Sequence, residues 1–266
     1  MIVEDKNRPI GFFDSGVGGL SVYARFREIL PFENTIYFGD LLHLPYGEKS
    51  KEELVGYARA ILNFFKSKNV KAVVIACNTS SAQAYDVIKT EYNFKIYPII
   101  QSCAKVISEL GYKRIGVFAT EGTVKAGKYT EELNKYNSDI IVKEVAQKNW
   151  VSIVEGTLND LEQAKKNIKN DIKEMLDFNP DKIILGCTHY PYLLSELKKY
   201  ADIDLFIDPA KIFVDYIKND LSTNLNSSNS IGSEEFYVSD NPVKFIENSE
   251  IFYHLENLPA KIEIFN

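Results

Sequence analysis

The sequence predicts an α/β fold of two similar domains with mainly parallel sheets flanked by helices. Three observations lead to this class. Short runs rich in Val, Ile and Phe alternate with longer stretches of helical spacing, which is typical of βαβ units. The short runs are almost wholly apolar, as parallel strands covered on both faces are. The chain has 266 residues, a length that suits two domains of ordinary size.

Seven apolar runs are the expected strands. In chain order they lie at residues 8–14, 34–40, 71–77, 94–100, 114–120, 182–188 and 204–209. The clearest helices are expected at residues 50–69 and 160–179. Ser50 followed by Glu53 is typical of a helix N-terminus. One face of this helix is apolar and consists of Leu54, Ala58, Ile61, Leu62 and Phe65.

Two pairs of segments resemble each other within the chain. "IGFFDSGVGG" from Ile10 resembles "IGVFATEGTV" from Ile115, at an offset of 115 − 10 = 105 positions. "AVVIACNT" resembles "KIILGCTH", and their cysteines are 187 − 77 = 110 positions apart. Duplicated α/β halves are the simplest interpretation, although buried parallel strands also resemble one another without common origin.

The bulk composition excludes several function classes. There are 31 Lys and Arg against 37 Asp and Glu, a net charge of −6 with no long basic tract, so we expect no nucleic acid partner. No apolar stretch approaches the ~18 residues of a membrane span, and the first residues lack signal-peptide features. We therefore expect a cytoplasmic protein with no membrane partner. Three cysteines are too few for a disulfide framework, so thiol chemistry is possible.

Two cysteines occupy equivalent positions at the ends of apolar runs. Polar residues follow each of them: Asn78 and Thr79 after Cys77, and Thr188 and His189 after Cys187. In open α/β sheets, functional groups gather beyond the carboxyl ends of the strands. Nearby backbone N–H groups there favour a thiolate and bind carboxylates. If the two halves face each other, the two sulfurs face across a cleft. The alternative is that each cysteine is a small buried apolar residue.

Metal and cofactor sites are the competing interpretations. Cys77, Cys187 and His189 could hold zinc, but no CxxC pair accompanies them, so we expect no metal. The "GVGG" run departs from the GxGxxG dinucleotide motif, no P-loop is present, and no strand-end lysine suits a Schiff base. We therefore expect no cofactor. Cys103 continues an apolar pattern and is expected in the core.

Further polar residues lie near these positions. Asp14 and Ser15 end the first strand, and Asp14 could hold an ammonium group, orient a thiol or cap a helix. The loop with Tyr46 and Gly47 could cover a small ligand, whereas His43 is expected to be a surface or packing residue. On sequence alone, Glu155 is interpreted as a solvated glutamate at a helix end.

Five segments together resemble the bacterial glutamate racemases of the aspartate/glutamate racemase superfamily. They are "FFDSGVGGLSV", "YFGDLLHLPYGEKS", "VIACNTSSA", "GVFATEGTV" and "ILGCTHYPYL", and the resemblance runs from about Ile10 to the end of the chain. It implies one domain from residues 1–98 plus 209–266, a second from residues 99–208, and an active site in the cleft between them. It also implies cofactor-independent interconversion of L- and D-glutamate for peptidoglycan biosynthesis, and a homodimer.

The resemblance also assigns the site residues. Cys77 and Cys187 match the two catalytic bases, and Asp14, Glu155 and His189 match the residues that assist them. The substrate-contacting positions are matched by Asp14, Ser15, Pro45, Tyr46, Gly47, Asn78, Thr79, Thr123, Thr188 and His189. Two bases suit this reaction because inverting a carbon requires removing a proton from one face and delivering one to the other.

Three other functions remain open from the sequence. A racemase for another acidic amino acid such as aspartate would use the same chemistry. A noncatalytic amino-acid-binding protein would not need paired thiols. A metal-dependent hydrolase would lose its activity to chelators.

Overall fold

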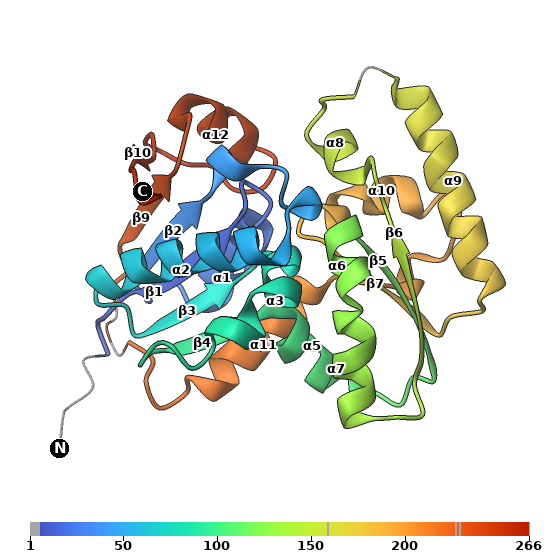
Figure 1. The fold of residues 1–266 in the computed structure, drawn as a ribbon, viewed down its shortest axis with the longest axis horizontal. Coiled ribbons are helices and arrows are strands. Elements are labelled where there is room, and N and C mark those ends of the chain that lie inside the picture. The colour runs from blue at the N-terminus through green and yellow to red at the C-terminus, as the bar shows by residue number, and fades with distance from the viewer. Residues whose placement is uncertain (1–5, 159, 227, 229, 266) are drawn as a thin grey trace.

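The computed structural model describes residues 6–158, 160–226, 228 and 230–265. Figure 1 shows two lobes side by side, each with a sheet between helices. The first sheet has the strand order β10-β9-β2-β1-β3-β4 and the second β6-β5-β7-β8. Every pairing between these strands is parallel. The predicted fold class is therefore confirmed.

The strands of the first sheet are β1 (Ile10–Asp14), β2 (Thr35–Gly39), β3 (Ala72–Ile75), β4 (Lys95–Pro98), β9 (Glu234–Val238) and β10 (Ala260–Lys261). Those of the second are β5 (Arg114–Ala119), β6 (Ile141–Ala146), β7 (Lys182–Gly186) and β8 (Phe206–Ile207). The order β2-β1-β3-β4 recurs as β6-β5-β7-β8. The two internally similar sequence pairs therefore fall on equivalent strands, β1 with β5 and β3 with β7.

The helices that the chain forms before residue 110 are α1 (Leu20–Ile29), α2 (Lys51–Ser67), α3 (Asn78–Gln83), α4 (Tyr85–Ile88) and α5 (Ile99–Ser108). The second lobe adds α6 (Glu121–Ala126), α7 (Lys128–Tyr136), α8 (Trp150–Val154), α9 (Leu161–Asp177) and α10 (Leu194–Leu197). The chain continues with α11 (Pro209–Asp220) and α12 (Pro242–Ser249). Short 3₁₀ turns occur at η1 (Leu41–His43), η2 (Tyr46–Glu48), η3 (Tyr190–Leu193) and η4 (Ile203–Leu205).

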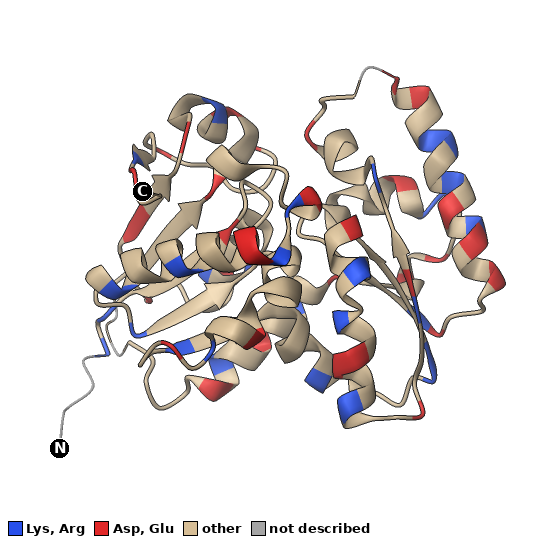
Figure 2. Ribbon diagram, viewed as in Figure 1, with Lys and Arg blue, Asp and Glu red and all other residues tan. Residues whose placement is uncertain are grey.

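The two long helices that the sequence predicts are present and amphipathic. All five apolar residues expected on one face of α2 are buried. Helix α9 buries Ala164, Ile168, Ile172 and Met175, and Figure 2 shows both signs of charge along the rest of it. None of the helices in the described part of the chain has the length and apolarity needed to cross a bilayer.

The lobes share one core at their junction. Helix α5 packs against α7 of the second lobe and against α11. A single apolar cluster includes Ile100 and Cys103 of α5, Leu133 of α7 and Phe213 of α11. Cys103 is fully buried there, as expected for a core residue.

Some strands of the structure do not correspond to any apolar run that the sequence marks as a strand. The expected strands correspond to β1–β5, β7 and β8, but β6 was not expected. It lies at the edge of its sheet and carries the charged side chains of Lys143 and Glu144, so it lacks the continuous apolar run of a central strand. Strand β9 lies within the closing segment of the chain.

We predict that Ser50→Ala lowers the free energy of unfolding by about 1 kcal/mol, because it removes an N-cap. The Ser50 hydroxyl accepts from the Glu53 N–H, and the Glu53 carboxylate accepts from the Ser50 N–H. Ser67→Ala, at the other end of α2, is the control, since its hydroxyl only donates to the Phe64 carbonyl. Urea unfolding of both variants checks this. An equal loss in both would contradict the capping role.

Candidate active site

The carboxyl ends of the central strands of both sheets meet where the lobes contact each other. Asp14 is the last residue of β1, Cys77 follows β3 by two residues, and Cys187 comes directly after β7. The Ser21 hydroxyl of α1 donates to the Thr188 carbonyl at 3.0 Å, which joins the two lobes at this point. Residues that are 110 positions apart in the chain are thereby gathered at one place.

Cys77 is buried and is the N-cap of α3, where its Sγ accepts from the Ser80 N–H at 3.5 Å. Burial, with smaller contributions from the Asp14 carboxylate and from Cys187, raises the pKa of Cys77 to about 12. The Ser80 hydrogen bond lowers this pKa without reversing the balance. The expected bias toward a thiolate is therefore wrong for Cys77, because burial and a neighbouring carboxylate outweigh one N–H group.

Cys187 is buried at the end of a three-residue polar chain. Its Sγ lies 3.9 Å from Nδ1 of His189, and Nε2 of the same ring lies 2.9 Å from Oε1 of Glu155. Burial lowers the pKa of His189, but the hydrogen bonds to Cys187 and Glu155 and their charges raise it overall, to about 10. A cationic imidazole therefore lies between a sulfur and a carboxylate at neutral pH.

Glu155 lies at the C-cap of α8, so the expected helix-end position is correct. Its side chain is 22% exposed, but its carboxylate contacts His189 rather than facing only solvent. The interpretation as a simply solvated glutamate is therefore wrong, because a turn 34 residues later in the chain supplies its partner.

Asp14 is buried and accepts from the Gly16 N–H at 3.0 Å. Burial raises its pKa to about 6, although the charge of His189 and the Gly16 and Gly19 N–H groups lower it. Asp14 does not cap a helix, since α1 begins after Gly19. Ser15 follows it and is partly exposed.

The glycines after Asp14 permit close approach between the lobes. A Cβ on Gly18 would lie 2.4 Å from the His189 ring and 2.4 Å from Oγ1 of Thr188. Any side chain at this position would therefore displace His189 or the loop. At Gly18, the "GVGG" run therefore allows close packing against Thr188 and His189 of the opposite lobe.

Three threonine hydroxyls form a second contact between the lobes. Thr79 Oγ1 lies 2.9 Å from that of Thr120 and 3.3 Å from that of Thr123, and the last two are 3.0 Å apart. Beside them, Asn78 Oδ1 accepts from the Tyr129 hydroxyl at 2.7 Å. The polar residues after Cys77 are therefore held partly by the opposite lobe.

The loop at residues 45–47 lies against α6. A Cβ on Gly122 would be 2.9 Å from the Gly47 carbonyl oxygen, so the two backbones are close. Tyr46 is buried and donates to Asp40 at 2.5 Å, whereas Pro45 is exposed. His43 stacks on Tyr57 with 3.8 Å between ring centroids, which confirms its packing role.

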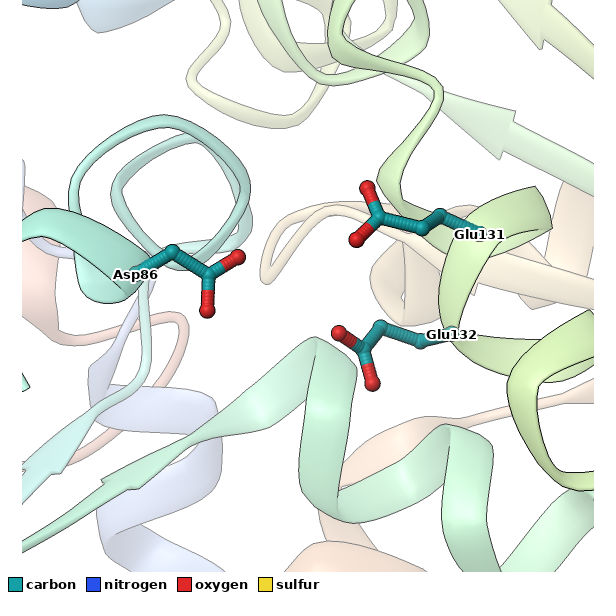
Figure 3. A group of neighbouring side chains, drawn as sticks. All are labelled: Asp86, Glu131 and Glu132. Carbon is teal, nitrogen blue, oxygen red and sulfur yellow. The ribbon is translucent and has the colours of Figure 1, made fainter.

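A cluster of three carboxylates lies elsewhere, between α4 and α7. Figure 3 shows Asp86 facing Glu131 and Glu132. The Lys128 ammonium lies 2.6 Å from Asp86, 2.8 Å from Glu131 and 3.8 Å from Glu132. The cluster therefore has its own cation, supplied by the chain, and forms an ionic bridge between the lobes.

Four residues of this region escaped the sequence interpretation: Gly18, Ser21, Thr120 and Tyr129. Gly18 belongs to the "GVGG" run, but its contact with His189 cannot be inferred from spacing. The others are ordinary helix and loop residues whose partners lie in the opposite lobe. No local pattern distinguishes them.

Comparison with known proteins gives consistent matches. The family model described as Asp/Glu/Hydantoin racemase matches residues 10–217. "Glutamate racemase 3" of Caldanaerobacter subterraneus subsp. tengcongensis is 36% identical, covering 98% of this chain and 96% of that protein. The glutamate racemase of Aquifex aeolicus is 36% identical, covering 87% of this chain and 88% of that protein.

Solved structures match as well. Glutamate racemase from Francisella tularensis, in complex with D-glutamate, has a TM-score of 0.89 and 32% identity, covering 97% of this chain and 98% of that one. The aspartate racemase of Picrophilus torridus, at 19% identity and a TM-score of 0.61 over 81% of this chain and 94% of that one, shares the fold. The chain therefore belongs to the Asp/Glu/hydantoin racemase family, with the glutamate racemases, and is an isomerase.

Proposed function

We propose that this protein interconverts L- and D-glutamate with two bases, Cys77 and Cys187, which act on opposite faces of the α-carbon. One observation carries the proposal: the two thiols are buried at the ends of equivalent strands, β3 and β7, in lobes that contact each other. Each thiol also has acid–base partners of its own, Asp14 near Cys77 and His189 near Cys187.

Glutamate is the favoured substrate among acidic amino acids. Relatives at 36% identity over nearly the whole chain are named glutamate racemases, and a solved neighbour at 32% identity holds D-glutamate. The aspartate racemase neighbour has only 19% identity. We assign substrate contact to Asp14, Ser15, Pro45, Tyr46, Gly47, Asn78, Thr79, Thr123, Thr188 and His189.

The two thiols begin the reaction in different states. The His189 cation lies beside Cys187 and suits this sulfur to act as a base. From the resemblance to glutamate racemases, we assign the α-proton of L-glutamate to Cys187 and that of D-glutamate to Cys77. Cys77, whose pKa is about 12, holds a proton and delivers it to the opposite face. The α-C–H bond breaks to Cys187, a new C–H bond forms from Cys77, and D-glutamate results. The reverse reaction uses the same atoms in opposite roles.

The neighbouring groups restore the protonation states. His189, held by Glu155, exchanges a proton with Cys187, and Asp14 does so near Cys77. Asn78, Thr79 and Thr188 donate hydrogen bonds that hold the carboxylates of the substrate, and the backbone N–H groups beside them stabilise charge that develops on the carbanion. No bound group is required by these steps, and we propose that the enzyme uses neither metal nor cofactor.

The remaining assignments follow from the family. We place the first domain at residues 1–98 plus 209–266 and the second at residues 99–208, because each sheet then lies wholly in one domain. We further propose a cytoplasmic homodimer that supplies D-glutamate for peptidoglycan and thus for cell-wall biogenesis and cell shape.

We predict racemisation of L-glutamate in metal-free buffer without pyridoxal phosphate. Because one methylene separates the two substrates, kcat/KM for L-aspartate should be roughly 10- to 200-fold lower. Chiral chromatography of each reaction measures both values. Loss of activity with EDTA and recovery with zinc would favour a metal-dependent enzyme. Faster turnover of aspartate would overturn the substrate assignment.

We predict that Cys77→Ser and Cys187→Ser each lower the racemisation rate roughly 100-fold or more, because serine is a far weaker acid than cysteine. In D₂O the surviving thiol still exchanges the proton on its own face. Cys77→Ser should therefore label L-glutamate only, and Cys187→Ser D-glutamate only, as proton NMR of the α-position would show. Cys103→Ser, also buried but outside the site, is the control and should racemise normally. A single-site variant that labels both enantiomers contradicts the mechanism.

We predict that Asp14→Asn stabilises the folded protein at neutral pH. The folded pKa of Asp14 is raised from 3.8 to about 6, so its contribution to stability is lost as pH rises through this window. The difference corresponds to about 3 kcal/mol, which the uncharged amide avoids. In urea unfolding, the free energy of unfolding of the variant, relative to that of wild type, should therefore increase from pH 4 to pH 7. Its racemisation should be slower than that of wild type. A difference in stability that does not change with pH would refute this.

A further inference from the structure

Tyr129 of α7 lies between the two turns that carry the thiols. Its side chain is fully buried. A Cβ on Gly186 would lie 2.9 Å from Cε2 of Tyr129, so the ring packs on the backbone just before Cys187. Its hydroxyl donates to Oδ1 of Asn78, the residue just after Cys77, at 2.7 Å. One side chain therefore contacts the neighbours of both thiols.

The hydrogen bond from Tyr129 determines the orientation of the Asn78 side-chain amide. Burial raises the pKa of Tyr129 well above its usual value, so the phenol keeps its proton and acts as a donor. Oδ1 of Asn78 faces this donor, which leaves Nδ2 on the other side of the amide. Asn78 is buried, with an exposed fraction of 3%. Its Nδ2 has no hydrogen-bond partner among the described residues.

A buried N–H group without a partner is unfavourable unless a ligand supplies an acceptor. An anionic oxygen satisfies it best, since hydrogen bonds to charged acceptors are the stronger ones. A freely rotating amide would instead present Oδ1 to the ligand for part of the time and repel an anion. Fixing the amide therefore selects a carboxylate over a cationic or neutral donor group.

We propose that Tyr129 is a positioning residue for the racemisation: its hydroxyl fixes the Asn78 amide so that Nδ2 donates to a carboxylate of the substrate. This inference rests on the proposed function and deepens it. Tyr129 belongs to the second lobe and Asn78 to the first, so the donor is oriented only where the lobes are in contact.

The variant Tyr129→Phe tests the role because it keeps the ring on Gly186 and removes only the hydroxyl. We expect KM to rise about tenfold for both enantiomers, as for a lost charged hydrogen bond, with kcat changed less than about threefold. Tyr97→Phe is the matched control. The Tyr97 ring is also buried, and its hydroxyl donates to one side-chain oxygen, that of Asp220, at 2.6 Å. Tyr97→Phe should therefore leave KM unchanged.

A double-mutant cycle separates positioning from general loss of structure. If Tyr129 acts through Asn78, then Tyr129→Phe has no further effect on KM in an Asn78→Ala background. A further tenfold rise there, or an unchanged KM for Tyr129→Phe alone, overturns the inference. If Tyr129→Phe does not fold, Asn78→Asp decides. It keeps the acceptor for Tyr129 but replaces Nδ2 with an oxygen, and a KM within about twofold of wild type would overturn the inference.

The proposed function is tested separately with the wild-type enzyme. Absence of glutamate racemisation by wild type overturns that function. Titration calorimetry of D-glutamate into wild type and Tyr129→Phe then still decides the inference, since it measures binding without turnover. Racemisation by wild type together with equal affinities for the two proteins overturns the inference alone.

Discussion

Burial of two thiols at the contact between the lobes is the constraint on which the site depends. Both thiols are almost fully buried, so burial disfavours a charge there, and the few neighbouring side chains add to this effect or offset it. Burial, reinforced by the Asp14 carboxylate, raises the pKa of Cys77 and keeps it protonated, whereas Cys187 lies beside the His189 cation held by Glu155. The equivalent strands β3 and β7 are thus followed by thiols with different charged neighbours. Asp14 at the end of β1 and Glu155 at the C-cap of α8 thus make an internally similar scaffold chemically asymmetric.

Much of the fold could be predicted from the sequence because the central strands are buried on both faces. Such strands must be apolar along their whole length, and β1, β3, β5 and β7 have this pattern. Helix α2 was recognised from its apolar face and its capping residues. Strand β6 was missed because one side of an edge strand reaches solvent, and its mixed composition resembles that of a loop.

The site was only partly predictable, for a related reason. The two cysteines can be recognised as candidate site residues from the sequence, since each follows an apolar run and precedes polar residues. The pKa of Cys77 is set by burial and by Asp14, which is 77 − 14 = 63 positions away, and the partner of His189 beside Cys187 is Glu155, 34 positions away. Local spacing shows neither effect. Tyr129 illustrates this limit: its surroundings in the chain are those of an ordinary helix, and its partner Asn78 lies 51 positions away. The same holds for Gly18, whose neighbour is the His189 ring.

The ionic bridge at Lys128 lies directly beside the contact between Tyr129 and Asn78. Lys128 precedes Tyr129 on α7 and holds Asp86 of the first lobe, so separating the lobes here breaks both this ion pair and the bond to Asn78. The two charged groups are 2.6 Å apart and the Lys128 side chain is only 8% exposed, so dissolved salt, which screens charges beyond about 8 Å, weakens this pair little. The contact that orients the Asn78 amide is thus reinforced by an ion pair on the adjacent residue.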